Sequence, residues 1–325
     1  MKVLRSFHVT LVVSFLILTM QKAQAKELRV VYSAVAGSQA LFFVTRDAGL
    51  FKKYGLDVSF VFVQGGTTAA LALLAGDVPL AAMAGISAVR LDLKGGDLVF
   101  VAGVVNSIDY AVVVAPHIKK ASDLKGKKFS ISRLGDFSDF AARQFLQKLG
   151  LNPDKDVAII QFGDQPSRFA ALQRGEVQGT IIDPSNLLAA RKLGLGILAT
   201  ADQLAVPAQG TAVVATKRSI KNATEDIRLF LKGLAEGIWY YKTFPEESRR
   251  SIAKYLGLKD PDQIEETYKF YRGLLPRVPY PTESGIDSLL RLASPGETRI
   301  KAKDLIDTRF VGELEESGFI SRLYK

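Results

Sequence analysis

Short apolar runs alternate with amphipathic stretches along the chain from residue 27 onward. The runs ELRVVYS (27–33), DVSFVFV (57–63), VPLAAMA (78–84) and LVFVAGVV (98–105) have the composition of strands. Stretches with helical periodicity, such as SQALFFVTRD and TTAALALLAG, separate them. Strands that take turns with helices in this way predict a doubly wound, mostly parallel sheet of the α/β class.

The same pattern starts afresh at residue 107. Strands are predicted in AVVVAP, KKFSIS, DVAIIQF, VQGTIID and GTAVVAT, the last ending at residue 216. The helices between them are SDFAARQFLQKLG, SRFAALQRG and PSNLLAARKLG, which end at Gly150, Gly175 and Gly194, where a glycine commonly terminates a helix. The chain therefore contains a second α/β unit.

After residue 217 the strand pattern disappears and amphipathic helices follow. They are IRLFLKGLAEGIWYYKTF, PEESRRSIAKYLG, PDQIEETYKFYRGLL and TESGIDSLLRLA. This tail could form a separate helical domain, or it could return to cover the first α/β unit. The wide apolar faces and the lack of a polar linker at 210–225 favour the return.

The stretch DAGLFKKYGLDV (47–58) contains two helix-stop glycines in succession. Gly49 can end one helix, Leu50 to Tyr54 makes barely one further turn, and Gly55 stops the chain again before an apolar strand. A helix interrupted in this way would bring the chain back beside the first strand without a long loop. We expect this stretch to be structural and to make no ligand contact.

Residues 1–25 have the features of a secretory signal peptide. Lys2 and Arg5 give a basic start, LVVSFLILTM (11–20) is the apolar segment, and AQA (23–25) is a small-residue cleavage site. A retained membrane anchor is the alternative, but a spanning helix needs about 20 apolar residues. We therefore expect an exported protein that begins at Lys26 after cleavage.

Composition and charge limit the partners and the kinds of chemistry that the protein could have. The chain has a net charge of +10, and loss of Lys2, Arg5 and Lys22 with the leader lowers it by three, which leaves a mild preference for anionic partners. The basic residues are dispersed, so nucleic acid is not an expected partner. Without cysteine, and with His117 as the one histidine after the leader, thiol chemistry and histidine-rich metal sites are excluded. We expect no catalytic residues, no metal and no cofactor.

Several motifs occur in an ordered series. They are Gly49-Leu50-Phe51, Gly55-Leu56-Asp57-Val58, Gly65-Gly66 and Gly76-Asp77-Val78, followed by DLKGKKFSIS (123–132) and ALQRGEVQGTIIDP (171–184). Their order and spacing resemble the periplasmic substrate-binding proteins of the nitrate, taurine and alkanesulfonate ABC-transporter group, the NMT1-like family. The same family name covers a yeast pyrimidine-precursor synthase, but that resemblance would require a cysteine-rich motif and an active-site histidine.

The resemblance implies a two-lobed, hinged protein with the type II periplasmic binding fold. Residues 26–106 plus 217–325 would form lobe 1, with the helical tail returning to it, and residues 107–216 would form lobe 2. Such a protein holds a small, here anionic, solute between its lobes and delivers it to the membrane permease of an ABC importer, acting as a monomer. A secreted enzyme on the same fold and a sensory module that presents its ligand to a receptor are the alternatives.

Ligand-binding residues are expected where parallel strands end, because open α/β sheets bind ligands at that edge. In lobe 1 the candidates are Ser38 and Gln39 after the first strand, and Gly85 and Ser87 after the third. Ser38 lies at a predicted helix N-terminus, whose N–H groups attract an anion. The alternative for Ser38 is a simple helix cap.

The candidates in lobe 2 are Tyr110, Arg133, Ser138 and Asp183. Ser138 and Asp183 could instead be helix caps, the latter with a proline after it, and Tyr110 could stack on a ligand or pack in the hinge. Arg133 directly follows the strand KKFSIS, so its guanidinium could bind an acidic group with two parallel hydrogen bonds. The alternative is a surface pair with a neighbouring aspartate.

Overall fold

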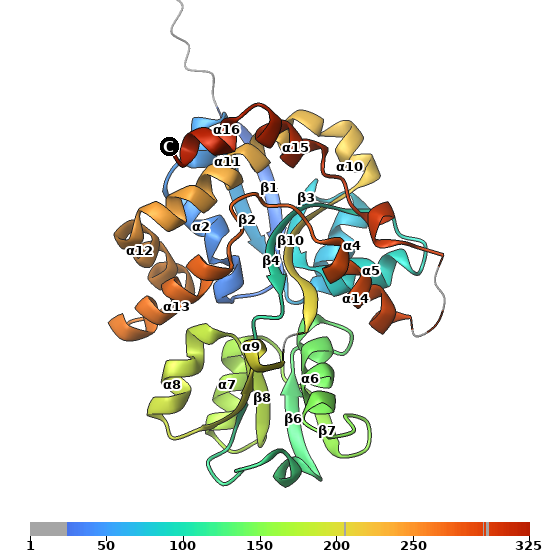
Figure 1. Cartoon of the computed structure of the whole chain (residues 1–325), viewed down its shortest axis with the longest axis vertical. Coiled ribbons are helices and arrows are strands. Elements are labelled where there is room, and N and C mark those ends of the chain that lie inside the picture. Colours follow the sequence, from blue (N-terminus) through green and yellow to red (C-terminus); the bar gives the residue numbers. More distant parts are fainter. Residues whose placement is uncertain (1–24, 205, 295, 297–298) are drawn as a thin grey trace, which may run out of the picture.

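The computed structural model describes residues 25–204, 206–294, 296 and 299–325. Residues 1–24 of the predicted leader lie outside this range. Two five-stranded sheets lie one above the other in Figure 1, and helices cover each of them. We call each sheet, with its helices, the first and the second lobe.

The first sheet has the strand order β2-β1-β3-β10-β4. Its strands combine the first four apolar runs of the sequence with one run from much later in the chain. They are β1 (Lys26–Tyr32), β2 (Leu56–Phe62), β3 (Leu80–Ala84), β4 (Leu98–Ser107) and β10 (Pro207–Thr216).

The second sheet has the order β7-β6-β8-β5-β9. Four of its strands were predicted, whereas β9 was not. Its strands are β5 (Ala111–Val114), β6 (Lys127–Ile131), β7 (Val157–Gln161), β8 (Gly179–Ile182) and β9 (Gly196–Thr200).

The predicted fold class is confirmed, and both sheets are mixed. β1 runs parallel to β2 and β3, whereas β10 runs antiparallel to β3 and β4. In the second sheet β6 runs parallel to β7 and β8, whereas β5 runs antiparallel to β8 and β9. At the first passage between the lobes, β5 follows β4 after three residues, with no crossover helix between them.

The strand pairing moves one boundary of the predicted division into lobes. Residues 207–216 form β10, which hydrogen-bonds to β3 and β4 of the first sheet. The sequence analysis assigned these residues to the second lobe, because the apolar run looked like a continuation of its strand series. The chain thus returns to the first sheet before residue 207 and not after residue 216. Otherwise the division at 26–106, 107–216 and 217–325 stays a prediction.

The interrupted helix forms as expected. α2 (Ala40–Asp47) ends before Gly49, which has a left-handed φ of 71°, and α3 (Leu50–Lys53) makes one turn before Gly55, with φ 82°. The Lys26 N–H then donates to the Gly55 carbonyl at 2.8 Å, where β2 starts beside β1. The two stops therefore return the chain to the edge of β1.

The remaining helices of the two α/β units follow their strands. In the first lobe these are η2 (Gly37–Gln39), α4 (Gly66–Ala75) and α5 (Gly85–Asp92). In the second lobe they are η3 (Ala121–Leu124), α6 (Phe137–Lys148), α7 (Gln165–Gln173), η4 (Pro184–Asn186), α8 (Leu187–Lys192) and α9 (Ala201–Leu204).

The helical tail returns to the first lobe, as predicted. α11 and α12 pack on α2, and α14 packs on α5 and β10. The Phe51 ring stacks on Phe230 of α11, with ring centroids 4.8 Å apart. The tail comprises α10 (Lys217–Asn222), α11 (Thr224–Thr243), α12 (Pro245–Leu256), α13 (Pro261–Leu274), α14 (Glu283–Ala293), η5 (Ala302–Leu305), α15 (Arg309–Glu316) and α16 (Phe319–Leu323).

One tail helix also contacts the second lobe. α13 packs on α8 and η4, where Lys192 pairs with Asp260 and the Gln263 amide donates to the Ser185 carbonyl. This contact was not expected from the sequence. It joins the lobes on one side of the crevice between them.

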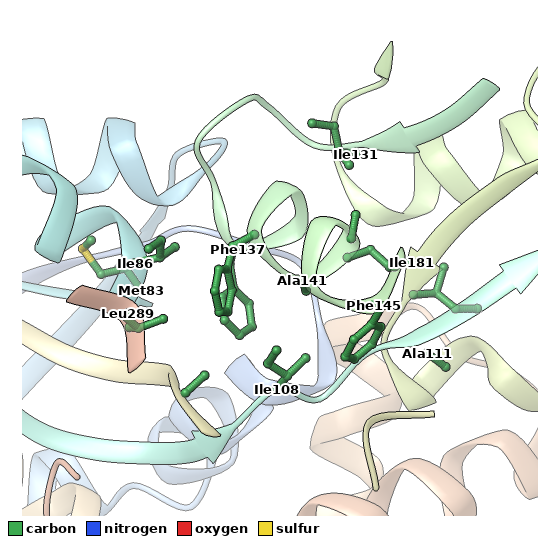
Figure 2. Close-up of a cluster of buried hydrophobic side chains, with 14 of the residues drawn as sticks. Met83, Ile86, Ile108, Ala111, Ile131, Phe137, Ala141, Phe145, Ile181 and Leu289 are labelled. Atoms are coloured by element: carbon green, nitrogen blue, oxygen red, sulfur yellow. The ribbon is translucent and has the colours of Figure 1, made fainter. Parts of the chain in front are cut away.

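An apolar cluster runs without interruption from one lobe into the other. Met83, Ile86 and Leu289 of the first lobe belong to the same buried cluster as Phe145 and Ile181 of the second. Figure 2 shows Phe137, at the start of α6, on the side of its helix that faces Ile86 and Leu289. The two lobes are therefore in contact, and the structure is a closed arrangement.

Candidate functional site

A cavity of about 60 Å³ lies between the lobes, at the ends of the parallel strands. Its first-lobe wall comes mainly from the loops after β1 and β2, with single residues of β3 and β10. The residue after β6, the starts of α6 and α7, and the crossing between β4 and β5 also line it. This is the edge at which open α/β sheets bind ligands. Its polar lining residues include Ser33, Ser38, Gln39, Gln64, Asp109, Tyr110, Ser132, Asp136, Ser138, Asp164, Gln165, Arg168 and Thr211.

Ser38 and Gln39 line the cavity, as the sequence analysis expected. Gln39 is 2% exposed, and its side-chain amide donates to the Ala82 carbonyl at 3.4 Å. Its Oε1 atom has no hydrogen-bond partner among the described residues. A buried acceptor of this kind is costly unless something donates to it.

Ser138 and Tyr110 also line the cavity. The Ser138 hydroxyl accepts from the Ser132 N–H at 2.7 Å and lies 2.5 Å from the Ser132 hydroxyl, which places both serines together at the start of α6. The Tyr110 ring lies tilted against Phe137, with centroids 5.6 Å apart. Burial raises the pKa of the Tyr110 phenol above its usual range. Tyr110 thus packs at the crossing and faces the cavity, and its stacking on a ligand stays a prediction.

Gly85 and Ser87 lie behind the cavity wall and are not among its lining residues. A Cβ atom at Gly85 would lie 2.7 Å from the Gln209 carbonyl oxygen, so α5 can start there only with glycine. The Ser87 side chain is buried against Gly66. Both positions support the wall, and their contact with a ligand stays a prediction.

Arg133 lies on the surface at the junction of the lobes, outside the lining of the cavity. Its guanidinium donates to the Thr68 hydroxyl at 3.2 Å and to the Gln64 side-chain oxygen at 3.3 Å. The alternative was a surface pair with a neighbouring aspartate; the charge of Arg133 does lower the pKa of Asp136, but its hydrogen bonds go to Thr68 and Gln64. Arg133 joins the second lobe to the first, and its contact with a solute stays a prediction.

Asp183 is fully buried and acts as the helix cap that was the alternative in the sequence analysis. Its Oδ1 atom accepts from the Ser185 N–H at 3.0 Å and from the Gln165 amide at 2.8 Å. Its Oδ2 atom accepts from the Gly37 N–H of the first lobe at 2.7 Å. It is outside the lining of the cavity, and it connects the two lobes directly.

Asp136 makes a second connection of this kind and was not predicted. Its Oδ1 atom accepts from the Thr67 hydroxyl at 2.9 Å and from the Thr67 N–H at 3.2 Å, at the N-terminus of α4 in the first lobe. Burial raises the pKa of Asp136, whereas the Thr67 hydrogen bonds and the charge of Arg133 lower it. The Ser87 hydroxyl also hydrogen-bonds to this carboxylate and lowers its pKa.

Two further buried charges in the cavity wall escaped the sequence analysis. Asp109 is 4% exposed, accepts from the Tyr271 hydroxyl at 2.9 Å, and has its pKa raised to about 7 by burial and, secondarily, by the charge of Asp183. Arg168 is 2% exposed and donates to the Gly163 carbonyl at 2.9 Å and to the Ile181 carbonyl at 3.3 Å. Burial lowers the pKa of Arg168.

Of Asp109 and Arg168, only Asp109 could have been recognised from the sequence as a buried charge. Asp109 is the single charge in the apolar stretch VVNSIDYAVVV, which could have marked it as a buried functional group. Arg168 stands in an ordinary amphipathic helix, and nothing in its local sequence distinguishes it from a surface arginine.

Metal binding and membrane insertion find no support in the described part of the chain. It contains no grouping of histidine, aspartate and glutamate side chains that could hold a metal ion. None of the helices within these residues has both the length and the apolar character that crossing a membrane requires.

Comparisons with known proteins agree on a binding fold. Residues 37–248 match the family described as NMT1/THI5 like. The Bacillus subtilis (strain 168) protein YtlA, described as a binding protein, is 25% identical over 242 residues, which are 72% of each chain.

Two solved structures share the fold at lower identity. The alkanesulfonate-binding protein SsuA of Xanthomonas axonopodis pv. citri, bound to MOPS, superposes with a TM-score of 0.71 at 18% identity, over 87% of this chain and 98% of its own. The periplasmic nitrate-binding protein NrtA of Synechocystis PCC 6803 gives 0.74 at 14% identity, over 90% and 89%.

Proposed function

Because this chain belongs to the NMT1/THI5-like family, we propose that it is a periplasmic protein that captures a small polar solute between its lobes and delivers it to an ABC importer. Two of its structural neighbours bind alkanesulfonate or nitrate, which supports a binding role. Export by a cleaved leader at 1–25, a monomeric state and a membrane permease as partner belong to the same proposal.

The observation that carries the proposal is the cavity itself. Buried polar side chains line it from both lobes, and direct hydrogen bonds between the lobes surround it, from Asp136 to Thr67 and from Asp183 to Gly37. A solute held there would be shielded from water, and it could leave only if the lobes separated. Opening and closing of hinged lobes is the usual motion of such proteins.

The first test is a thermal-shift screen of small polar compounds on protein that has been unfolded, freed of bound solute and refolded. A solute at about 100 times its dissociation constant should add about 2.7 kcal/mol to the free energy of unfolding. Tyr110→Ala should abolish this gain, because Tyr110 lines the cavity, whereas the control Tyr240→Ala on α11 should retain it. A screen in which no compound stabilises the protein contradicts the proposal.

The second test concerns chemistry and motion. We expect the solute to be recovered unaltered after incubation, since the protein is proposed to bind and not to convert it. Small-angle scattering should show a smaller radius of gyration when solute is added to protein in its open form. An altered product would instead support the alternative of a secreted enzyme on this fold.

The net charge and the position of Arg133 in the sequence favoured an anionic solute. With Arg133 outside the lining of the cavity, the nature of the solute depends on the charges that do face it. Those charges favour a solute that is not anionic.

A further inference from the structure

Several backbone N–H groups that could attract an anion are already paired with carboxylates of this chain. Asp136 occupies the N-terminus of α4 through Thr67, and Asp164 occupies that of α7 by accepting from the Ser167 N–H at 2.9 Å. The Gly37 N–H, beside the loop after β1, is taken by Asp183. An external anion would have to displace a side chain at each of these positions.

The N-terminus of α6 is not an alternative anion site. It lies between Asp136, which precedes the helix, and Asp139 in its first turn. Asp139 is buried and accepts from the Gly135 N–H at 2.8 Å. An anion at this helix start would therefore be next to two carboxylates.

The charged side chains that line the cavity are mostly acidic. The acidic ones are Asp109, Asp136 and Asp164, and the basic one is Arg168. Two nitrogens of the Arg168 guanidinium are committed to the carbonyls of Gly163 and Ile181, and the guanidinium also bonds to the Tyr110 hydroxyl. The lining thus carries more acidic than basic side chains, and its basic side chain is already paired.

The lining also contains a buried acceptor without a donor. Gln39 Oε1 has no hydrogen-bond partner among the described residues, and the Gln39 side chain is more than nine-tenths buried. Buried acceptors without a donor destabilise a protein, so a molecule that donates to them would be favoured. Nitrate and sulfonate groups carry acceptors only and cannot do this.

We propose that the solute is a small nitrogenous compound with N–H donors and no negative charge, and that Asp109 accepts a hydrogen bond from it. This inference rests on the proposed function. Phe62, Tyr110 and Phe137 line the cavity as well, and their rings suit a planar molecule and favour a positively charged one. Burial and the charge of Asp183 raise the pKa of Asp109, and a donor that bonds to its ionised form would lower the pKa again.

Two series of compounds with matched shapes test the charge preference. Acetamidinium, acetamide and acetate share one planar shape, and benzamidinium, benzamide and benzoate share another. At equal concentration and ionic strength, the amidinium and amide members should raise the melting temperature, and the carboxylates should not. Calorimetry on the better-bound series then gives affinities.

Variants locate the effect at Asp109. Asp109→Asn should weaken binding of the amidinium about tenfold or more, the loss of one charge-assisted hydrogen bond, and change amide binding little. Asp57→Asn, at a carboxylate whose side chain is 55% exposed, is the control and should change neither. Should Asp109→Asn fail to fold, Gln39→Met provides the second variant, which should weaken amidinium and amide binding alike.

The outcomes separate the two proposals. Binding of acetate, benzoate or nitrate in preference to their nitrogenous counterparts overturns the charge inference and leaves the proposed function standing. If neither series binds, the compounds found by the broad screen are used instead. Anionic binders among them overturn the charge inference, and uncharged or cationic nitrogenous binders support it. A screen without any binder contradicts the proposed function, and the inference falls with it.

Discussion

The strongest prediction concerns the stability of the protein as a function of pH when Asp109 is replaced by asparagine. Burial raises the pKa of the Asp109 carboxyl from 3.8 to about 7. The folded protein therefore holds this proton more tightly than the unfolded chain. The resulting stability is fully present below about pH 4 and is lost as the pH rises through about 7.

The magnitude follows from the two pKa values. The difference between 3.8 and about 7 corresponds to a loss of about 4 kcal/mol in the free energy of unfolding of the wild type. Asp109→Asn removes the titrating group and keeps an oxygen that can accept from Tyr271. The free energy of unfolding of the variant relative to the wild type should therefore increase by about this amount from pH 4 to pH 8.

Urea denaturation at several pH values measures this difference. Burial also raises the pKa of Asp92, to about 6, but Asp92 is present in both proteins and cancels in the comparison. Asp57→Asn provides the baseline for removing an exposed carboxylate. A difference between Asp109→Asn and wild type that stays flat across this pH range would refute the reasoning.

Three further changes test the contacts between and within the lobes. Asp183→Ala removes the acceptor for the Gly37 N–H, so the unliganded protein should open and lose about 1–3 kcal/mol in the free energy of unfolding. Small-angle scattering should show the opening as a larger radius of gyration. An unchanged radius would show that this bond does not hold the lobes together. Gly37→Ala should lower the melting temperature, because a Cβ there would overlap the Tyr271 ring, whereas Gly273→Ala in α13, with open space around its Cβ, should raise it slightly. Arg133→Ala should leave solute affinity in the closed form nearly unchanged if Arg133 only joins the lobes, and calorimetry that shows a loss of about 1.5–3 kcal/mol would restore the predicted contact with an anionic solute.

Much of the fold could be predicted because it depends on local patterns. Apolar runs, helix periodicity and the glycine stops at Gly49 and Gly55 depend on residues close in sequence, and the structure confirms them. The strand β9 (Gly196–Thr200) was missed because its short run follows directly on a helix end. The assignment of β10 to the wrong lobe has a related cause. The strands with which a strand pairs depend on residues far away in the sequence, which local patterns do not show.

The site was only partly predictable for a similar reason. Ser38, Gln39 and Ser138 follow from the rule that ligands bind at the ends of parallel strands, and the cavity includes all of them. Asp183 reaches a residue 146 positions earlier in the chain, and no periodicity signals such a contact. Arg168 gains its importance from burial alone, which depends on how the two lobes meet.

The pairing of β4 with β10 makes the second lobe an insertion into a β-hairpin. Ser107, the last residue of β4, is the partner of Pro207, the first residue of β10, in an antiparallel ladder. Two-residue turns such as Asn-Gly commonly join strands in this relation. Deleting residues 108–206 and joining the ends with such a turn would leave the first sheet continuous, so the larger half of the molecule could be made as a shorter chain of its own.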